Sequence, residues 1–168
     1  LIYFRDNSTV SISGGKIDGN NTNGKSGLVF ITGNSNVIMD SIKVINSAAD
    51  GITKRNSRGA TYIRACIVDN CKRRGIWQLA ADRLFAFDNF ISNCLMDGFD
   101  LDAYSTNSVI AKNKASLCKR YGVFIEEGAN GHIVLANKLS DNTTGVHLFN
   151  KEVEKKNTSR NLVAYNLC

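Results

Sequence analysis

The sequence predicts an all-β fold, a right-handed parallel β-helix of six to seven coils with 23–24 residues in each coil. Three observations predict it. A glycine followed by an apolar residue recurs at steps of 24, 24, 23, 24 and 23 residues. Between these glycines lie β-branched or aromatic segments broken by Asn, Ser, Asp and Gly, a pattern typical of strands of about 3–5 residues joined by tight corners. The 168 residues contain no proline, so every backbone N–H can join a ladder.

Columns of one residue type define the coils. The recurring pairs are Gly27-Leu28, Gly51-Ile52, Gly75-Ile76, Gly98-Phe99, Gly122-Val123 and Gly145-Val146. Cysteine recurs at Cys71, Cys94 and Cys118, and asparagine recurs in two columns, Asn46, Asn70, Asn93 and Asn89, Asn113, Asn137, Asn166. Successive coils of a β-helix stack about 4.8 Å apart, so residues of one column become neighbours in space.

The asparagine and cysteine columns are predicted to be structural. Asparagine tolerates the left-handed conformation that a tight corner requires, and it bonds the backbone there. Stacked cysteines point their Cβ atoms in the same direction, which suits free thiols packed in the core better than disulfides. No paired Cys or His spacing accompanies them, so these thiols are not predicted to bind a metal.

A single domain is predicted over residues 1–168. Residues 1–26 form the first coil, 27–150 the regular coils, and 151–168 an insertion around residues 151–156 followed by an incomplete last coil. Because the sequence stops in repeat register, we expect the coil to continue in a longer chain or to be covered by a partner or further copy at its C-terminal end. No apolar run reaches about 18 residues, so no membrane span is predicted.

The charge balance narrows the class of partner. The 21 Lys and Arg exceed the 15 Asp and Glu, and the net charge of +6 favours a polyanion. The sequence lacks a basic helix and the aromatic-basic motifs of single-strand binders. Nucleic acid is therefore not the predicted partner, which leaves an acidic polysaccharide or an anionic surface.

The strand after each glycine is predicted to form one sheet whose second and fourth positions face outward. The second positions hold Thr53, Trp77, Asp100, Phe124 and His147, and the fourth positions hold Arg55, Leu79, Asp102, Glu126 and Phe149. This face offers carboxylates for proton transfer or cation binding, an aromatic ring on which a sugar can stack, and a titratable imidazole.

Two basic corners, Lys72-Arg73-Arg74 and Lys119-Arg120-Tyr121, flank Asp97 on the coil between them. An enzyme acting on a uronic acid polymer needs cations that neutralise the substrate carboxylate, because this makes the adjacent C–H more acidic, and a base that removes its proton. The alternative is that these acidic and basic side chains pair across coils without a catalytic role.

Two segments resemble known families. Ser13-Gly14-Gly15-Lys16-Ile17-Asp18-Gly19-Asn20 resembles the opening coil of pectin-lyase-like β-helix proteins, and Asp97 to Asp102, followed by Tyr121-Gly122-Val123, resembles the catalytic region of alginate (mannuronan) epimerases. The resemblance implies a right-handed β-helix with an open groove and epimerisation at carbon five of a uronate. Asp102 matches the second active-site aspartate of that family.

The leading hypothesis is a carbohydrate-active β-helix protein, secreted or on a virion surface, that binds an acidic polysaccharide. The favoured interpretation is enzymatic, as a uronan lyase or epimerase; the alternative is a non-catalytic β-helix segment of a phage tailspike or an adhesin. The candidate catalytic residues are Asp100, Asp102, Glu126, Tyr121 and His147. The candidate substrate-binding residues are Trp77, Arg74, Lys119, Arg120, Arg55 and Phe124. No cofactor is required, and Ca²⁺ is the cation that Asp97, Asp100 and Asp102 could hold.

Overall fold

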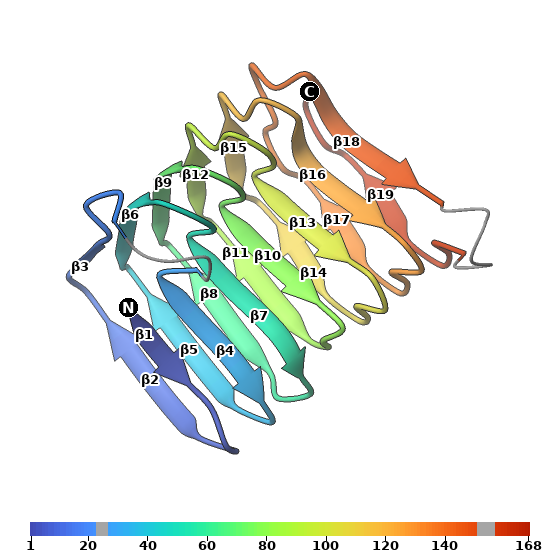
Figure 1. The fold of residues 1–168 in the computed structure, drawn as a ribbon. Helices are drawn as coiled ribbons and strands as arrows, with labels where there is room; N and C mark the ends of the chain where they lie inside the picture. Colours follow the sequence, from blue (N-terminus) through green and yellow to red (C-terminus); the bar gives the residue numbers. More distant parts are fainter. Residues whose placement is uncertain (23–26, 151–156) are drawn as a thin grey trace.

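The chain, seen in a computed structural model, winds into a right-handed parallel β-helix (Figure 1). The structure describes residues 1–22, 27–150 and 157–168, and within these residues it contains strands and no helix, so none that could cross a membrane. The N- and C-termini lie at opposite ends of the stack (Figure 1). The predicted insertion at 151–156 lies outside the described residues.

The described residues form three parallel sheets, two of seven strands and one of five. Sheet A contains β1 (Ile2–Phe4), β4 (Val29–Gly33), β7 (Ile52–Ser57), β10 (Ile76–Leu79), β13 (Phe99–Asp102), β16 (Tyr121–Glu126) and β18 (Thr144–Phe149). Sheet B contains β2 (Thr9–Ser13), β5 (Asn36–Asp40), β8 (Thr61–Arg64), β11 (Leu84–Phe87), β14 (Val109–Ala111), β17 (Ile133–Leu135) and β19 (Leu162–Ala164). Sheet C contains β3 (Lys16–Asp18), β6 (Lys43–Ser47), β9 (Ile67–Cys71), β12 (Phe90–Ser92) and β15 (Lys114–Ser116). The predicted fold class is confirmed.

The glycine column exists because the backbones of neighbouring coils meet closely at this corner. A Cβ added to Gly98 would lie 2.7 Å from the carbonyl oxygen of Gly122, and one added to Gly75 would lie equally close to the carbonyl oxygen of Gly98. Real Cβ atoms essentially never come so near, so only glycine fits. The repeat that reveals the fold in the sequence is therefore a packing requirement.

The predicted alignment of Gly27 with Gly51 is wrong by one residue. Ile52 pairs with Val29, so Leu28 and not Gly27 lies opposite Gly51. Gly27 is needed for another close approach, because a Cβ there would lie 2.6 Å from Thr53 Oγ1. Spacing alone could not reveal this shift, since an apolar residue follows either position.

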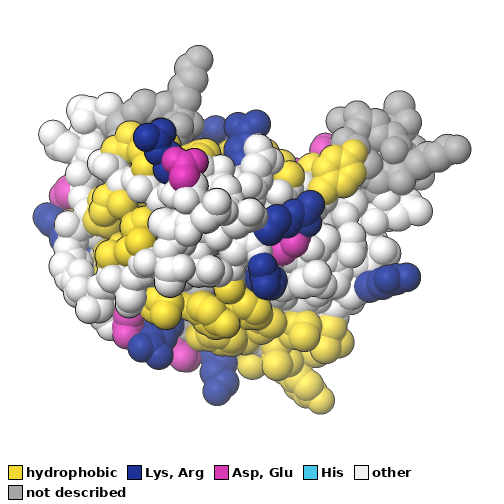
Figure 2. Space-filling view, turned by 90° about the horizontal axis from the view of Figure 1, so that it is seen from below, with side chains coloured by type: hydrophobic (Ala, Val, Ile, Leu, Met, Phe, Trp, Pro, Cys, Tyr) yellow, Lys and Arg dark blue, Asp and Glu magenta, His cyan; other side chains and the backbone are white. Residues whose placement is uncertain are grey.

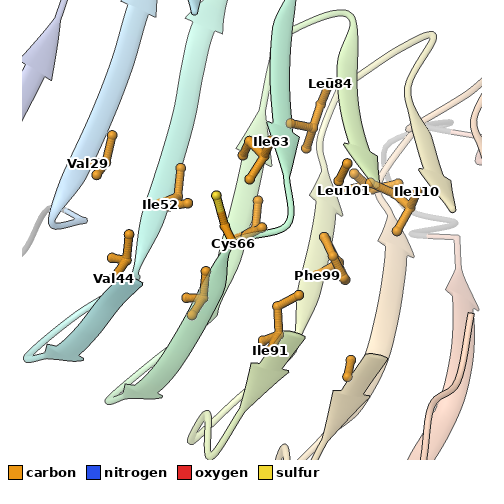
Figure 3. Packing of buried hydrophobic residues seen from close by; sticks show 14 of the residues in the cluster. Val29, Val44, Ile52, Ile63, Cys66, Leu84, Ile91, Phe99, Leu101 and Ile110 are labelled. Atoms are coloured by element: carbon orange, nitrogen blue, oxygen red, sulfur yellow. The ribbon is translucent and has the colours of Figure 1, made fainter. Parts of the chain in front are cut away.

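Inward-facing side chains stack into one continuous apolar core, which includes Val29 and Ile52 of sheet A and Ile63 and Leu84 of sheet B (Figure 3). Each is fully buried. Burial of such a side chain contributes about 1.5–3 kcal/mol. The cysteine column also lies in this core as free thiols, which confirms its predicted role. The pKa of Cys94 is raised well above its ordinary value, because it shares hydrogen bonds with the thiols on either side and is buried.

The two asparagine columns differ in backbone conformation and in hydrogen bonding. Asn46, Asn70 and Asn93 adopt left-handed φ angles of 56°, 54° and 53°, as predicted. The second column does not: there the preceding residue, such as Lys112 with φ 57°, takes the left-handed conformation. The buried Asn113 side chain instead accepts a hydrogen bond of 2.9 Å from the N–H of the preceding coil and donates one of 3.0 Å to the Ala86 carbonyl. The prediction of left-handed corners was therefore wrong for this column.

Polar side chains enter the core at the corner between sheets A and B. Lys54, in an inward position of β7, is fully buried, and its Nζ donates to the carbonyl oxygens of Gly59 at 2.5 Å and of Asp82. Burial lowers the pKa of Lys54 to about 7. His132 is equally buried; its Nδ1 accepts the Ser108 N–H at 3.2 Å, and burial lowers its pKa to about 4. Neither residue was singled out from the sequence.

Candidate active site

The candidate site lies on the outward face of sheet A. The pairing of β10, β13, β16 and β18 places Trp77 beside Asp100, Asp100 beside Phe124, and Phe124 beside His147. The same pairing places Leu79 beside Asp102 and Glu126 beside Phe149. The predicted outward columns are thus assembled as expected over these four coils.

Three carboxyl groups converge at the centre of this face. One oxygen each from Asp100, Asp102 and Glu126 lies within 4.8 Å of the others. Asp100 is fully buried, whereas Asp102 and Glu126 remain half-buried and reach solvent. We refer to these three residues as the carboxyl cluster.

Trp77 and Arg74 form one wall of the carboxyl cluster. The Trp77 indole Nε1 donates a hydrogen bond of 3.0 Å to Asp102 Oδ2. The guanidinium carbon of Arg74 lies 4.6 Å from the centre of the Trp77 rings, and its Nε forms an ion pair with Asp100. The carboxylate of Asp102 is therefore oriented by the same indole that a bound sugar would contact.

Arg74 is a buried cation shared among three carboxylates. Beyond Asp100, it lies 4.0 Å from Asp97 and 3.8 Å from Asp50, and its own side chain is only 9% exposed. The backbone N–H of Arg74 also donates to Asp50 Oδ1 at 3.1 Å. Asp50 was not identified from the sequence, although it precedes Gly51 as Asp97 precedes Gly98. That repeated Asp-Gly pair is the signal that could have found it.

Asp97 is held by Arg120 and does not belong to the carboxyl cluster. Arg120 donates two hydrogen bonds to it, Nε to Oδ1 at 3.1 Å and Nη2 to Oδ2 at 2.7 Å. Of the three residues predicted to hold a metal, the structure brings Asp100 and Asp102 together with Glu126, and it places Asp97 in this ion pair. Arg74 and Arg120 were predicted to bind substrate, and both are engaged in ion pairs within the protein.

Burial and nearby negative charges shift Glu126 and Asp100 toward their protonated forms. The pKa of Glu126 is raised to about 7 by burial and by the nearby negative charges of Asp102 and Glu127. The pKa of Asp100 is raised well above its ordinary value by burial, which the charge of Arg74 only partly offsets. Glu126 is thus a solvent-reaching carboxyl group that exchanges a proton near neutral pH, as a general acid or base requires.

An aromatic group borders the carboxyl cluster on the C-terminal side. The Tyr121 and His147 rings stack with centroids 4.6 Å apart and planes at 12°. Phe124 lies 4.7 Å from Tyr121, and Arg120 lies 5.2 Å above each of these two rings. Phe124 is only 6% exposed, so it supports the stack from beneath. Arg55 and Lys119 are exposed and supply positive charge at the rim.

Stacked coils with three parallel sheets are the architecture of a β-solenoid protein, and a family comparison agrees with this class. The family model of the right-handed β-helix region matches residues 1–162. The chain therefore belongs to the right-handed β-helix family. A search of curated proteins found no match.

Proposed function

We propose that the protein binds an acidic polysaccharide along the outward face of sheet A and modifies it by transferring the proton beside a uronate carboxylate. The convergence of Asp100, Asp102 and Glu126 between the Trp77 indole and the Tyr121–His147 stack carries this proposal. The carboxyl groups supply acid–base chemistry, and the aromatic rings on both sides supply surfaces for sugar rings. Such polymers lie outside cells, which supports a secreted or virion-surface location.

In the proposed reaction Glu126 is the base. Its ionised carboxylate takes the proton from carbon five, and the electron pair of that C–H bond moves into the uronate carboxyl group as an enolate. In an epimerase a proton then returns to carbon five from the opposite face, for which Tyr121 or His147 is the donor. In a lyase the enolate instead forms a C4–C5 double bond, and the departing oxygen on carbon four takes a proton.

Positive charge must offset the enolate. Arg74 and Arg120 are held by aspartates, so Arg55 and Lys119 at the rim are the protein groups proposed to bind the substrate carboxylates. A hard divalent cation such as Ca²⁺ also fits the carboxyl cluster, because its donors are all carboxylate oxygens and Asp100 Oδ1 is buried without a hydrogen-bond partner. Bound there, Ca²⁺ would supply charge neutralisation, and Tyr121 or His147 would transfer the proton.

The test is turnover of polyuronates, such as alginate and pectate. Absorbance near 235 nm detects the double bond of elimination, and proton spectra detect epimerisation. We expect activity in the wild type, loss of at least about 100-fold in Asp102→Asn, and none of that loss in Asp88→Asn, an exposed aspartate outside sheet A. Full turnover by Asp102→Asn would contradict the proposed site. Loss of activity with a chelator and its return with Ca²⁺ would assign the cation role to the carboxyl cluster.

The ion pairs of Arg74 and Arg120 across coils favour a second candidate, a non-catalytic surface-binding β-helix as in a tailspike or an adhesin. In these pairs the charges of Arg74 and Arg120 are engaged within the protein and not offered to a substrate. Binding of polyuronates without turnover of any of them would support this candidate over the enzyme.

A further inference from the structure

The outward face of sheet B carries an apolar column from the second coil to the last coil that the structure describes. Strand pairing aligns one residue from each coil after the first, where Ser11 begins the column. We call this column the apolar ridge; its residues are Ile38, Tyr62, Phe85, Val109, Ile133 and Leu162. All are partly or largely exposed, up to 52% for Leu162. A gathering of hydrophobic side chains is visible along the lower margin of the molecule in Figure 2.

This face is also electrically neutral. In the sheet B strands as the structure describes them, the only charged outward residues are Asp40 and Arg64, and these form an ion pair of 2.8 Å. The next outward column is apolar over the later coils, with Phe87 and Leu135 half-buried. A protein of net charge +6 would repel its own copies through most surfaces, whereas this face presents no net charge to a second copy.

The shape of this face is complementary to the same face of a second copy that runs in the opposite direction. Tyr62 and Phe85 stack with ring centroids 4.9 Å apart and stand out from the sheet. Toward the first coil the surface falls into a hollow of about 490 Å³, whose lining includes Ser11 and Ala60 and also Ile38 and Tyr62 of the ridge. The bulky Leu162 lies at the opposite end of the ridge. When two copies run in opposite directions, the bulky end of one copy lies against the hollow of the other.

We propose that two copies of the chain associate through the apolar ridge as an antiparallel two-fold dimer. Full overlap requires the symmetry axis to pass through the middle strand, β11. Leu162 of one copy then enters the hollow beside Ser11 of the other, and Ile38 faces Ile133. Seven strands with two outward columns cover about 450 Å² of each copy, so the pair buries about 900 Å² in total, the size of a weak, transient interface.

The dimer leaves the proposed substrate face uncovered, because sheets A and B lie on opposite sides of the core (Figure 1). The two sheet A faces would point away from each other and could engage two segments of polymer. The inference does not depend on that function, since it rests on sheet B alone.

Sedimentation equilibrium between about 1 and 200 μM tests the dimer. We expect a monomer–dimer equilibrium in the wild type and at least a tenfold larger dissociation constant in Ile38→Lys and in Ile133→Glu, measured separately. An equimolar mixture of these two variants should associate again, because the lysine of one copy then faces the glutamate of the other. Leu95→Lys, an exposed apolar residue outside sheet B, is the control and should dimerise as the wild type does.

Three results would overturn the proposal. The first is a monomer at every concentration, which would leave the ridge to another occupant. The second is a dimer that survives both single substitutions. The third is dissociation of each variant without recovery in the mixture, with unchanged thermal unfolding of both variants, because the antiparallel register requires that recovery.

Discussion

At the scale of single residues, Arg74 is the side chain on which the candidate site depends most. It is nearly buried and lies against Asp50, Asp97 and Asp100 together. A buried cation of this kind offsets carboxylates that burial would otherwise force to take up protons. Its position explains how several acids can be crowded beneath one face of a sheet.

Replacing Arg74 with methionine should therefore destabilise the fold by about 3–5 kcal/mol, because the substitution leaves buried carboxylates without their partner. Urea unfolding monitored by circular dichroism measures this loss. The double variant Arg74→Met with Asp100→Asn should recover part of it. The Asp100→Asn single variant completes the cycle, and a loss in the double variant equal to the sum of the two single losses would contradict the coupling of Arg74 and Asp100 that the structure indicates.

His132 should make the stability of the fold sensitive to acid. Burial lowers its pKa in the folded state to about 4, below its ordinary value of 6.5, so between these values the unfolded chain binds a proton that the folded chain does not. The contribution of His132 to the free energy of unfolding is fully present above pH 6.5, and it falls by roughly 3 kcal/mol as the pH decreases to 4. Unfolding free energies measured at pH 7, 5.5 and 4 should show this decline, and in His132→Gln the decline should be smaller by that amount.

At the scale of elements, the second asparagine column links each coil to the next through side chains. Asn89, Asn113 and Asn137 each bond one carbonyl of the preceding coil, and each accepts an N–H from it. The parallel strands of sheets B and C begin or end beside this column. The column is therefore a buried hydrogen-bonded spine that fixes the register of the coils.

Asn113→Ala should cost about 2–3 kcal/mol, because it leaves the buried backbone N–H of Asn89 without its acceptor and removes a donor from the Ala86 carbonyl. Asn166→Ala should cost less, because Asn166 lies on the last described coil and is half exposed. Thermal unfolding of the two variants gives the comparison. Equal losses would contradict the role of burial in this spine.

At the scale of the whole molecule, the sequence predicted the coil number, the parallel sheets and the columns that meet on sheet A, because a fixed period and a glycine requirement are both written in the residues. It left open whether Arg74 and Arg120 bind substrate or pair with aspartates across coils, since spacing gives alignment along the axis but not which way a long side chain turns. The one-residue shift at Gly27 and the buried Lys54 were missed for the same reason. Both depend on contacts between coils rather than on the repeat.

The outward faces of sheets A and B differ in chemical character. Sheet A concentrates titratable and aromatic side chains, whereas sheet B presents a neutral apolar ridge. Arg55 and Lys119 are exposed beside the acidic centre of sheet A. Such a pattern of positive rim and acidic centre is the arrangement proposed to hold a polyuronate while a carboxyl group reacts with it.

The pH dependence of kcat/KM on a polyuronate tests the central claim, that Glu126 transfers the proton. Because a base must be ionised, the rate should rise as the pH increases through about 7, the pKa of Glu126. Glu126→Gln should lack this activity at every pH, and Glu127→Gln should shift the rise to lower pH, because it removes a negative charge that raises this pKa. An active Glu126→Gln enzyme with the wild-type pH profile would contradict the account.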